Sequence, residues 1–191
     1  MSKDRLAAFT DAVLAIIMTI LVLELERPET PTLEAFWDLR ESFFAYALSF
    51  WWLASFWISH HNLWDNAQRI DMSVIWWSML VLFCLSLVPY TTRIAGANFH
   101  SAVALGFYGI VITLSTAANI GLNRALGRAN ADRPELKETL DKYCHSLSID
   151  CAIKAVALVI CIFVWPPAMM WSVALAAAFI YAMRSRWTAL S

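Results

Sequence analysis

The chain has 191 residues, of which 60% are hydrophobic and only 15% charged, and its mean hydropathy is +0.59. Soluble domains carry about a quarter charged residues, so this composition argues against a soluble protein and favours an integral membrane protein. The formal net charge is −1, and we expect no nucleic-acid partner.

Six segments have the length and composition of membrane helices. A spanning helix needs about 20 mostly apolar residues, and such segments occur at approximately 6–25, 43–64, 74–92, 101–122, 147–165 and 168–183. Their apolar runs are continuous, whereas strands of a membrane barrel alternate apolar and polar residues. We therefore predict an all-α integral membrane protein, with residues 1–191 forming a single six-helix unit.

The first segment begins with two ionisable residues, Arg5 and Asp11. At about 100° per residue, Asp11 lies roughly 120° away from a helical face formed by Arg5, Phe9, Ala12, Ile16, Thr19, Ile20 and Leu23. Ionisable groups in membrane helices normally face the bundle interior and mark function. Alternatively, Arg5 reaches the lipid headgroups and the apolar face contacts lipid or core. A cleaved signal peptide is a further alternative, but Asp11 and the missing small-residue cleavage site argue against it.

The second segment has no formal charge and ends in FWISHHNLW, residues 56–64. Adjacent histidines point in different directions on a helix, so His60 and His61 make a poor two-ligand metal site. We expect one of them to be structural and the other to face the cytoplasm, and pH sensitivity is an open alternative. No metal-ligand spacing is found among the cysteines, which are Cys84, Cys144, Cys151 and Cys161. We predict neither a metal site nor a cofactor.

The third segment contains Pro89, and the fifth contains Asp150 and Lys154, one helical turn apart. Pro134 followed by ELKETLDKY is typical of a helix start with acids in its first turn, so the fifth helix is expected to extend well beyond 147–165. Asp150 and Lys154 can pair within this helix. A solvated or structural pair is the favoured interpretation, and a proton or substrate site is the alternative.

Lysine and arginine are distributed unevenly between the connections, which predicts the orientation in the membrane. With a cytoplasmic N-terminus, that side holds ten of them: Lys3, Arg5, Arg69, Arg124, Arg128, Arg133, Lys137, Lys142, Arg184 and Arg186. The opposite side holds only Arg27, Arg40 and Arg93. Six spans with both termini in the cytoplasm fit this distribution.

A resemblance to a known family adds to this reading. The pattern Arg5-x-x-x-Phe9-Thr10-Asp11 resembles the R-x-x-x-F-S-D signature of the transmembrane protein 175 family, the endolysosomal potassium channel and its prokaryotic relatives. The stretch FWISHHNLW and the later LVPYTTRI, residues 87–94, are also similar to the family pattern. The resemblance covers most of the first three segments, and the last three agree in number only. Thr10 departs from the usual serine but keeps the hydroxyl.

The resemblance implies a homotetramer in a prokaryotic plasma membrane, with the first helix of each subunit lining a central pore that has no re-entrant filter loop. Positions carried over by their offset from Asp11 place the constriction at Ile16, Ile20 and Leu23, and Thr19 matches a hydroxyl layer associated with selectivity. The signature residues would hold this helix in place, with network partners at Trp57, His60, His61 and Asn62. In our hypothesis, His60, His61 or Asn62 donates a hydrogen bond to Asp11, and Trp57 or Trp64 faces Arg5.

The resulting prediction is a moderately potassium-selective cation channel and not an enzyme. Its partners would be its own copies, the lipid bilayer and permeating monovalent cations. A ring of apolar side chains can close such a pore by expelling water. A small secondary transporter or proton-coupled permease is the alternative, although no internal repeat is visible and Pro89 is the single candidate helix break. An enzyme would need a nucleophile, metal cluster or carboxylate pair, and the sequence indicates none.

Overall fold

The computed structural model describes residues 2–176, apart from the side chains of Asn62 and Asp65, and within this part the regular secondary structure is helical. The helices are α1 (Lys3–Leu23), α2 (Leu33–Asp38), α3 (Arg40–Asn66), α4 (Met72–Ser86), α5 (Val88–Ala97), α6 (Ala102–Ala129) and α7 (Pro134–Phe163). Residues 168–176 are also helical. The all-α prediction is thus confirmed for the part of the chain that the structure describes.

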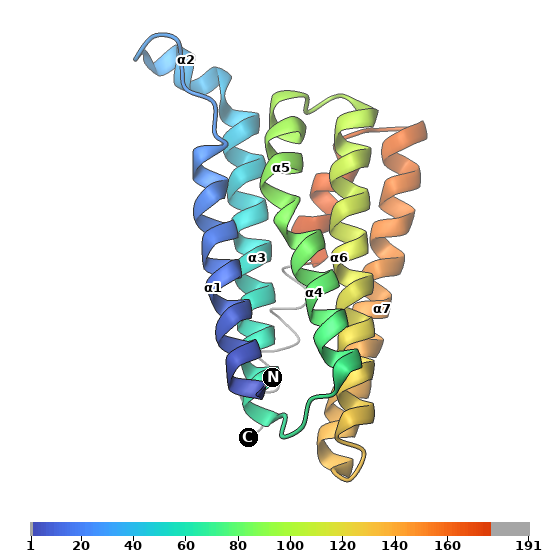
Figure 1. The fold of residues 1–191 in the computed structure, drawn as a ribbon. Helices are drawn as coiled ribbons and strands as arrows, with labels where there is room; N and C mark the ends of the chain where they lie inside the picture. The colour runs from blue at the N-terminus through green and yellow to red at the C-terminus, as the bar shows by residue number, and fades with distance from the viewer. Residues whose placement is uncertain (1, 177–191) are drawn as a thin grey trace, which may run out of the picture.

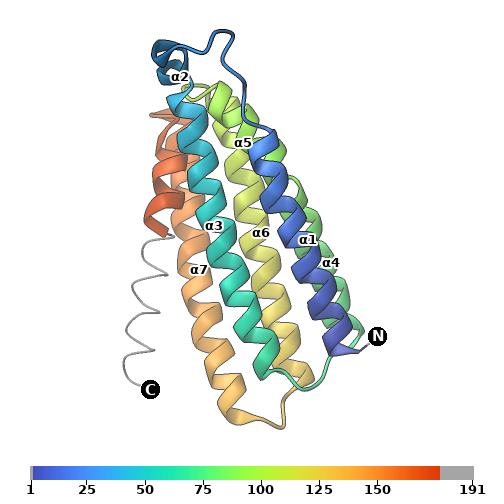
Figure 2. The ribbon, with the colours of Figure 1, turned by 90° about the vertical axis from the view of Figure 1, so that its left-hand side faces the viewer.

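The long helices run up and down one bundle, so the connections alternate between its two ends (Figures 1 and 2). The connections at 67–71 and 130–133 lie at the end where the chain begins, and those at 24–32 and 98–101 lie at the other end. Helix α6 is central and packs against α4, α5 and α7. Helix α1 packs against α3, α4 and α5, and forms one edge of the bundle in Figure 1.

Local capping explains why α1 begins earlier than the predicted span 6–25. The Ser2 side chain accepts a hydrogen bond from the Arg5 backbone N–H, and Asp4 lies in the first turn, where a negative charge favours the helix. At the other end, the helix stops at Leu23, and the Glu24 N–H bonds back to Ile20 O. The end therefore precedes Pro28 by several residues.

The predicted span 74–92 is divided into α4 and α5 at Leu87 and extends to Ala97. Pro89 lies in the first turn of α5 and has no N–H to continue the hydrogen bonding of α4. The turn is tighter at the division, where Leu87 N donates to Cys84 O, three residues back, at 3.2 Å. Pro89, the single candidate helix break in the sequence, thus lies two residues after the point where the span divides.

Helices α6 and α7 are longer than their predicted spans. Helix α6 begins after Ser101, whose hydroxyl caps the Ala104 N–H, and it continues to Ala129. Helix α7 begins at Pro134, as the pattern of proline and acidic residues predicts. The predicted extension of this helix is thus confirmed.

The short helix α2 was not predicted. It lies in the connection after α1, capped by Thr32 and preceded by Pro28 and Pro31. Its apolar side chains Leu33, Phe36 and Trp37 are exposed. Figure 1 shows α2 projecting beyond the end of the bundle. Six residues are too few for a periodic pattern to be recognised in the sequence.

Four described segments are long and apolar enough to cross a membrane: α1, α4 together with α5, α6 and α7. Helix α3 has the length of the predicted span 43–64, but its tryptophan, serine and histidine residues lower its hydropathy. The last predicted span, 168–183, lies partly outside the described residues. The six-span count and the cytoplasmic termini therefore stay predictions.

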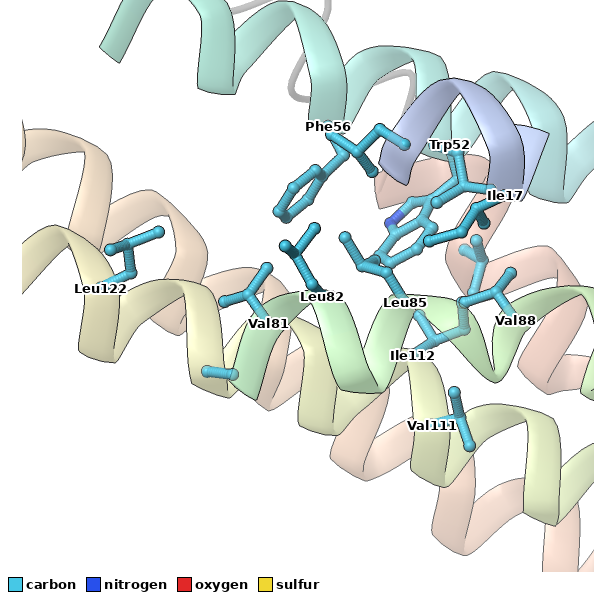
Figure 3. Packing of buried hydrophobic residues seen from close by; sticks show 14 of the residues in the cluster. Ile17, Trp52, Phe56, Val81, Leu82, Leu85, Val88, Val111, Ile112 and Leu122 are labelled. Atoms are coloured by element: carbon cyan, nitrogen blue, oxygen red, sulfur yellow. The ribbon is translucent and has the colours of Figure 1, made fainter. Parts of the chain in front are cut away.

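A continuous apolar core joins the helices. Ile17 of α1 reaches Trp52 of α3 and Leu85 of α4, and all three side chains are buried (Figure 3). Asp150 and Lys154 are also buried, with 4% and 0% of their surface exposed. The solvated form of the favoured interpretation is therefore wrong, because α7 turns both side chains into the bundle.

Helices α3 and α5 approach closely where Gly96 faces Ser42. A Cβ added at Gly96 would lie 2.8 Å from the Ser42 Cα atom. Small residues allow such backbone contact between membrane helices. The contact holds α5, the second part of the divided span, against α3.

Gly96→Ala should lower the melting temperature of the purified protein, because overpacking against backbone costs about 1–3 kcal/mol. Gly127→Ala is the matched control near the end of another helix, since its added Cβ would meet Leu140 at an ordinary 3.6 Å. The control should be neutral or slightly stabilising, as alanine is the better helix former. Thermal unfolding followed by tryptophan fluorescence checks both variants, and equal melting temperatures would contradict the close approach.

Candidate functional site

Helix α1 has a buried face and an exposed face. The buried side chains recur every three or four residues, as expected for one side of a helix, and they are Leu6, Thr10, Leu14, Ile17 and Leu21. The Thr10 hydroxyl donates to Leu6 O at 2.9 Å within the helix. The methyl group that distinguishes Thr10 from serine is therefore accommodated in the core.

The stripe predicted from the first segment lies on the exposed face. Phe9, Ile16, Ile20 and Leu23 have 50%, 58%, 36% and 79% of their surface exposed, and Thr19 is exposed between them. Figure 2 shows α1 at the surface, with no other helix in front of it. These side chains are thus free to face lipid or other copies of the chain.

The Thr19 hydroxyl has a defined orientation. It donates to Ile16 O at 2.8 Å, within α1. A hydroxyl has one donor and two acceptor positions. With its proton directed to the backbone, Thr19 offers only oxygen lone pairs to whatever lies beside α1.

The side chain of Asp11 is held by Trp57 of α3. The Trp57 indole N–H donates to Asp11 Oδ1 at 2.9 Å, and the indole ring stacks on His61 with 5.6 Å between ring centroids. Trp57 was expected to face Arg5 and instead binds the carboxylate. Arg5 itself is exposed, next to the buried Leu6 in the sequence and about 100° from it around the helix.

His60, one of the three residues expected to bind Asp11, does not bind it. It is buried, stacks on Phe56 at 4.7 Å and lies beside Asn119 of α6. Its ring nitrogens have no hydrogen-bond partner among the described residues. His61 is exposed, so the two histidines do point in different directions. The side chain of Asn62 lies outside the described part.

Two contacts that the sequence did not indicate hold the ends of α1. Lys3 Nζ donates to Trp64 O at 3.2 Å, near the C-terminal end of α3, where the helix dipole favours a positive charge. At the opposite end, Arg93 of α5 pairs with Glu24 at 3.3 Å. Both partners are distant in sequence, so no local pattern predicts these contacts. The one sequence feature that could have suggested them is the position of Lys3 and Glu24 at the two ends of α1.

The described residues contain no group of three or more histidine, cysteine, aspartate or glutamate side chains that could hold a metal ion. The charged groups around α1 are arranged as pairwise contacts between helices. Their chemistry is therefore that of holding a helix in place, and the exposed stripe is the surface they leave available.

Residues 5–89, which begin at the signature arginine, match the family described as "Endosomal/lysosomal potassium channel TMEM175". A protein of Chryseobacterium sp. (strain P1-3), named a potassium channel, is 35% identical over 150 residues, which cover 78% of each chain. A potassium channel of Chamaesiphon minutus is 29% identical over 60% of this chain and 62% of its own.

A solved structure has the same fold. It is titled as a lysosomal potassium-selective channel TMEM175 homolog from Chamaesiphon minutus, and the TM-score is 0.74 at 24% identity. The match covers 96% of this chain and 97% of the other.

Trp57→Phe should lower the melting temperature, because it removes the N–H donor to Asp11 and keeps an aromatic ring beside His61. The loss of one hydrogen bond to a charged group at a partly exposed site corresponds to about 1 kcal/mol. Trp51→Phe is the matched control on α3, as Trp51 is exposed and contacts Phe50 through its ring. Thermal unfolding in the same detergent compares the two, and an equal effect would exclude a stabilising role for the Trp57–Asp11 bond.

Proposed function

Since the chain belongs to the TMEM175 family of potassium channels, we propose that it is the subunit of a moderately potassium-selective cation channel. The observation that carries this proposal is the exposed apolar stripe on α1, at the edge of the protomer. One protomer cannot enclose a pore with one such helix, so copies of the chain must meet around an axis. A homotetramer in the plasma membrane fits the resemblance, and such a channel is not an enzyme.

The constriction in this proposal is formed by Ile16, Ile20 and Leu23 from each copy. A ring of isoleucine side chains offers no oxygen to replace the water of a hydrated cation, so it blocks ions by dewetting. The exposure of Ile16 and Leu23 in the protomer supports this role, because neither side chain is used in the protomer core. Opening would require α1 to change its position relative to the axis.

Thr19 is the proposed selectivity residue. Its hydroxyl proton is engaged with Ile16 O, so a ring of Thr19 side chains would present oxygen lone pairs to the axis. Potassium loses water more readily than sodium, and such a ring would favour it modestly. A single layer of hydroxyl groups gives weaker discrimination than the stacked carbonyl rings of other potassium channels.

Charged contacts at three points of α1 support its role as the wall of the pore. Lys3, Asp11 and Glu24 are each bound by α3 or α5. None of the three belongs to the constriction, so the helix is held without using the residues that would face the axis. Asp11 and its partner Trp57 therefore act as structural residues in this proposal.

Ile16→Asn should increase potassium leak through the purified protein in liposomes, because the amide keeps water in the constriction. Ile162→Asn on α7 is the matched control, with the same change at a side chain that is also half exposed. Single-channel recording and potassium flux measure both variants. A conductance and leak equal to wild type would remove Ile16 from the pore.

The same liposomes test the channel itself. The wild-type protein should pass potassium down its gradient without a coupled ion. A saturating flux that needs a counter-gradient would instead support the transporter alternative, and no flux from any variant would contradict the proposal.

Thr19→Val should reduce the potassium-to-sodium permeability ratio by about two- to tenfold, the effect of losing one modest polar contact. Valine keeps the branched shape, so the pore width should change little. Thr113→Val is the control, because the Thr113 hydroxyl makes the same kind of intrahelical bond, to Gly109 O, on α6. Reversal potentials under bi-ionic conditions measure the ratio. An unchanged ratio in Thr19→Val would exclude the hydroxyl layer.

A further inference from the structure

A buried ion pair lies in α7, which makes no direct contact with α1 among the principal helix contacts of the described residues. Lys154 Nζ is 2.6 Å from Asp150 Oδ2, and both side chains are buried. Charges inside a membrane segment are costly and are usually retained for a function. The proposed channel does not use this pair, so its presence needs a separate explanation.

The partners of this pair come from two further helices. Lys154 Nζ donates to the Thr116 hydroxyl of α6 at 3.0 Å, and the same hydroxyl lies 3.4 Å from Asp150 Oδ2. The ammonium also lies 5.3 Å from the ring centroid of Trp52 on α3, within the range of a cation–π contact. One ammonium thus joins α7, α6 and α3.

This arrangement is not the one that stability alone favours. Asp150 Oδ1 is buried and has no hydrogen-bond partner among the described residues. A well-packed apolar pair is often as stable as a buried ion pair or more stable, whereas removing one charge is strongly destabilising. The pair itself lies within α7, and the contacts of Lys154 with Thr116 and Trp52 are what restrict the positions of α6 and α3. An apolar pair would lack this restriction.

Helix α3 connects this pair to α1. Trp52 and Trp57 are five residues apart, about 7.5 Å along the helix axis. Trp57 binds Asp11 of α1, and Trp52 lies beside Ile17 of α1 in the core (Figure 3). A shift of α3 at Trp52 would consequently displace both the polar and the apolar contact that orient α1.

We propose that Lys154 and Asp150 are positioning residues that fix α3 and, through it, the orientation of α1, and so set the open probability of the channel. This inference rests on the proposed function. Neither side chain reaches the exposed stripe, so the pair would not contact the permeating ion. Conductance and ion preference of open channels should then be independent of it.

The test compares Lys154→Met, Asp150→Leu and the double variant. Each single variant leaves one buried group without its partner and should yield less folded protein. The double variant should recover the wild-type melting temperature, because no unpaired charge remains. Its open probability should still differ from wild type by about threefold or more, with unchanged single-channel conductance and potassium-to-sodium ratio. Ser115→Ala, which removes a hydroxyl bonded within α6 to Val111 O, is the control and should behave as wild type.

A second measurement reports the position of α1 without using conduction. The Ala15→Cys variant, in a Cys151→Ser background, is labelled with bimane, a fluorophore that tryptophan quenches at short range. Residue 15 lies about one helical turn from Asp11. The bimane quenching should change in the double variant and remain unchanged in Ser115→Ala. Cys151 is replaced because it is the most accessible native cysteine among those described.

The outcomes separate this inference from the proposed function. A double variant with wild-type stability, open probability and bimane quenching would overturn the positioning role. A wild-type protein that passes no potassium would contradict the proposed function, and the bimane measurement alone would then decide whether the pair orients α1.

Discussion

The hydrogen bond from the Trp57 indole to Asp11 determines which side of α1 is left free. A carboxylate on a membrane helix must find a donor, and here the donor is on α3. Because Asp11 lies roughly 120° from the stripe that contains Ile16, binding the carboxylate to α3 turns that stripe away from the protomer. The buried side chains Leu14 and Ile17 occupy the remaining side. The orientation of α1 thus follows from one polar contact and a narrow apolar face.

The attachment of α1 to the bundle is weaker than that of the central helices. Its exposed side chains contribute nothing to the protomer core, and its polar contacts are few and partly exposed. Helix α6, by contrast, is buried on most of its surface. Elements that move are drawn from the less stable part of a structure. A helix that is held at only a few points on a rigid bundle is suited to changing its position.

Local sequence patterns predicted the features that depend on one helix. Helical spacing predicts the two faces of α1 and the opposite directions of His60 and His61. The helix-start residues predict the start of α7 at Pro134. Contacts between helices were not predictable in the same way. The partner of Asp11 was placed among His60, His61 and Asn62 because their residue types suggested it, whereas packing decided that Trp57 reaches the carboxylate. The burial of Lys154 depends on Thr116 and Trp52, which no pattern within α7 reveals. The family resemblance supplied the proposed role of α1, which periodicity alone left open.

The positions of the charged contacts have a consequence for how α1 can deform. Lys3 and Asp11 attach its first half to α3, and Glu24 attaches its far end to Arg93 of α5. The stretch between Asp11 and Glu24 is about 20 Å long and includes Ile16, Thr19, Ile20 and Leu23. Turning this helix about its own axis would break the contacts at both ends, whereas bowing of the middle stretch would break neither. A helix held at both ends bends most near its middle, close to Ile16 and Thr19, and the apolar contacts of Ile17 with Trp52 and Leu85 would have to adjust there.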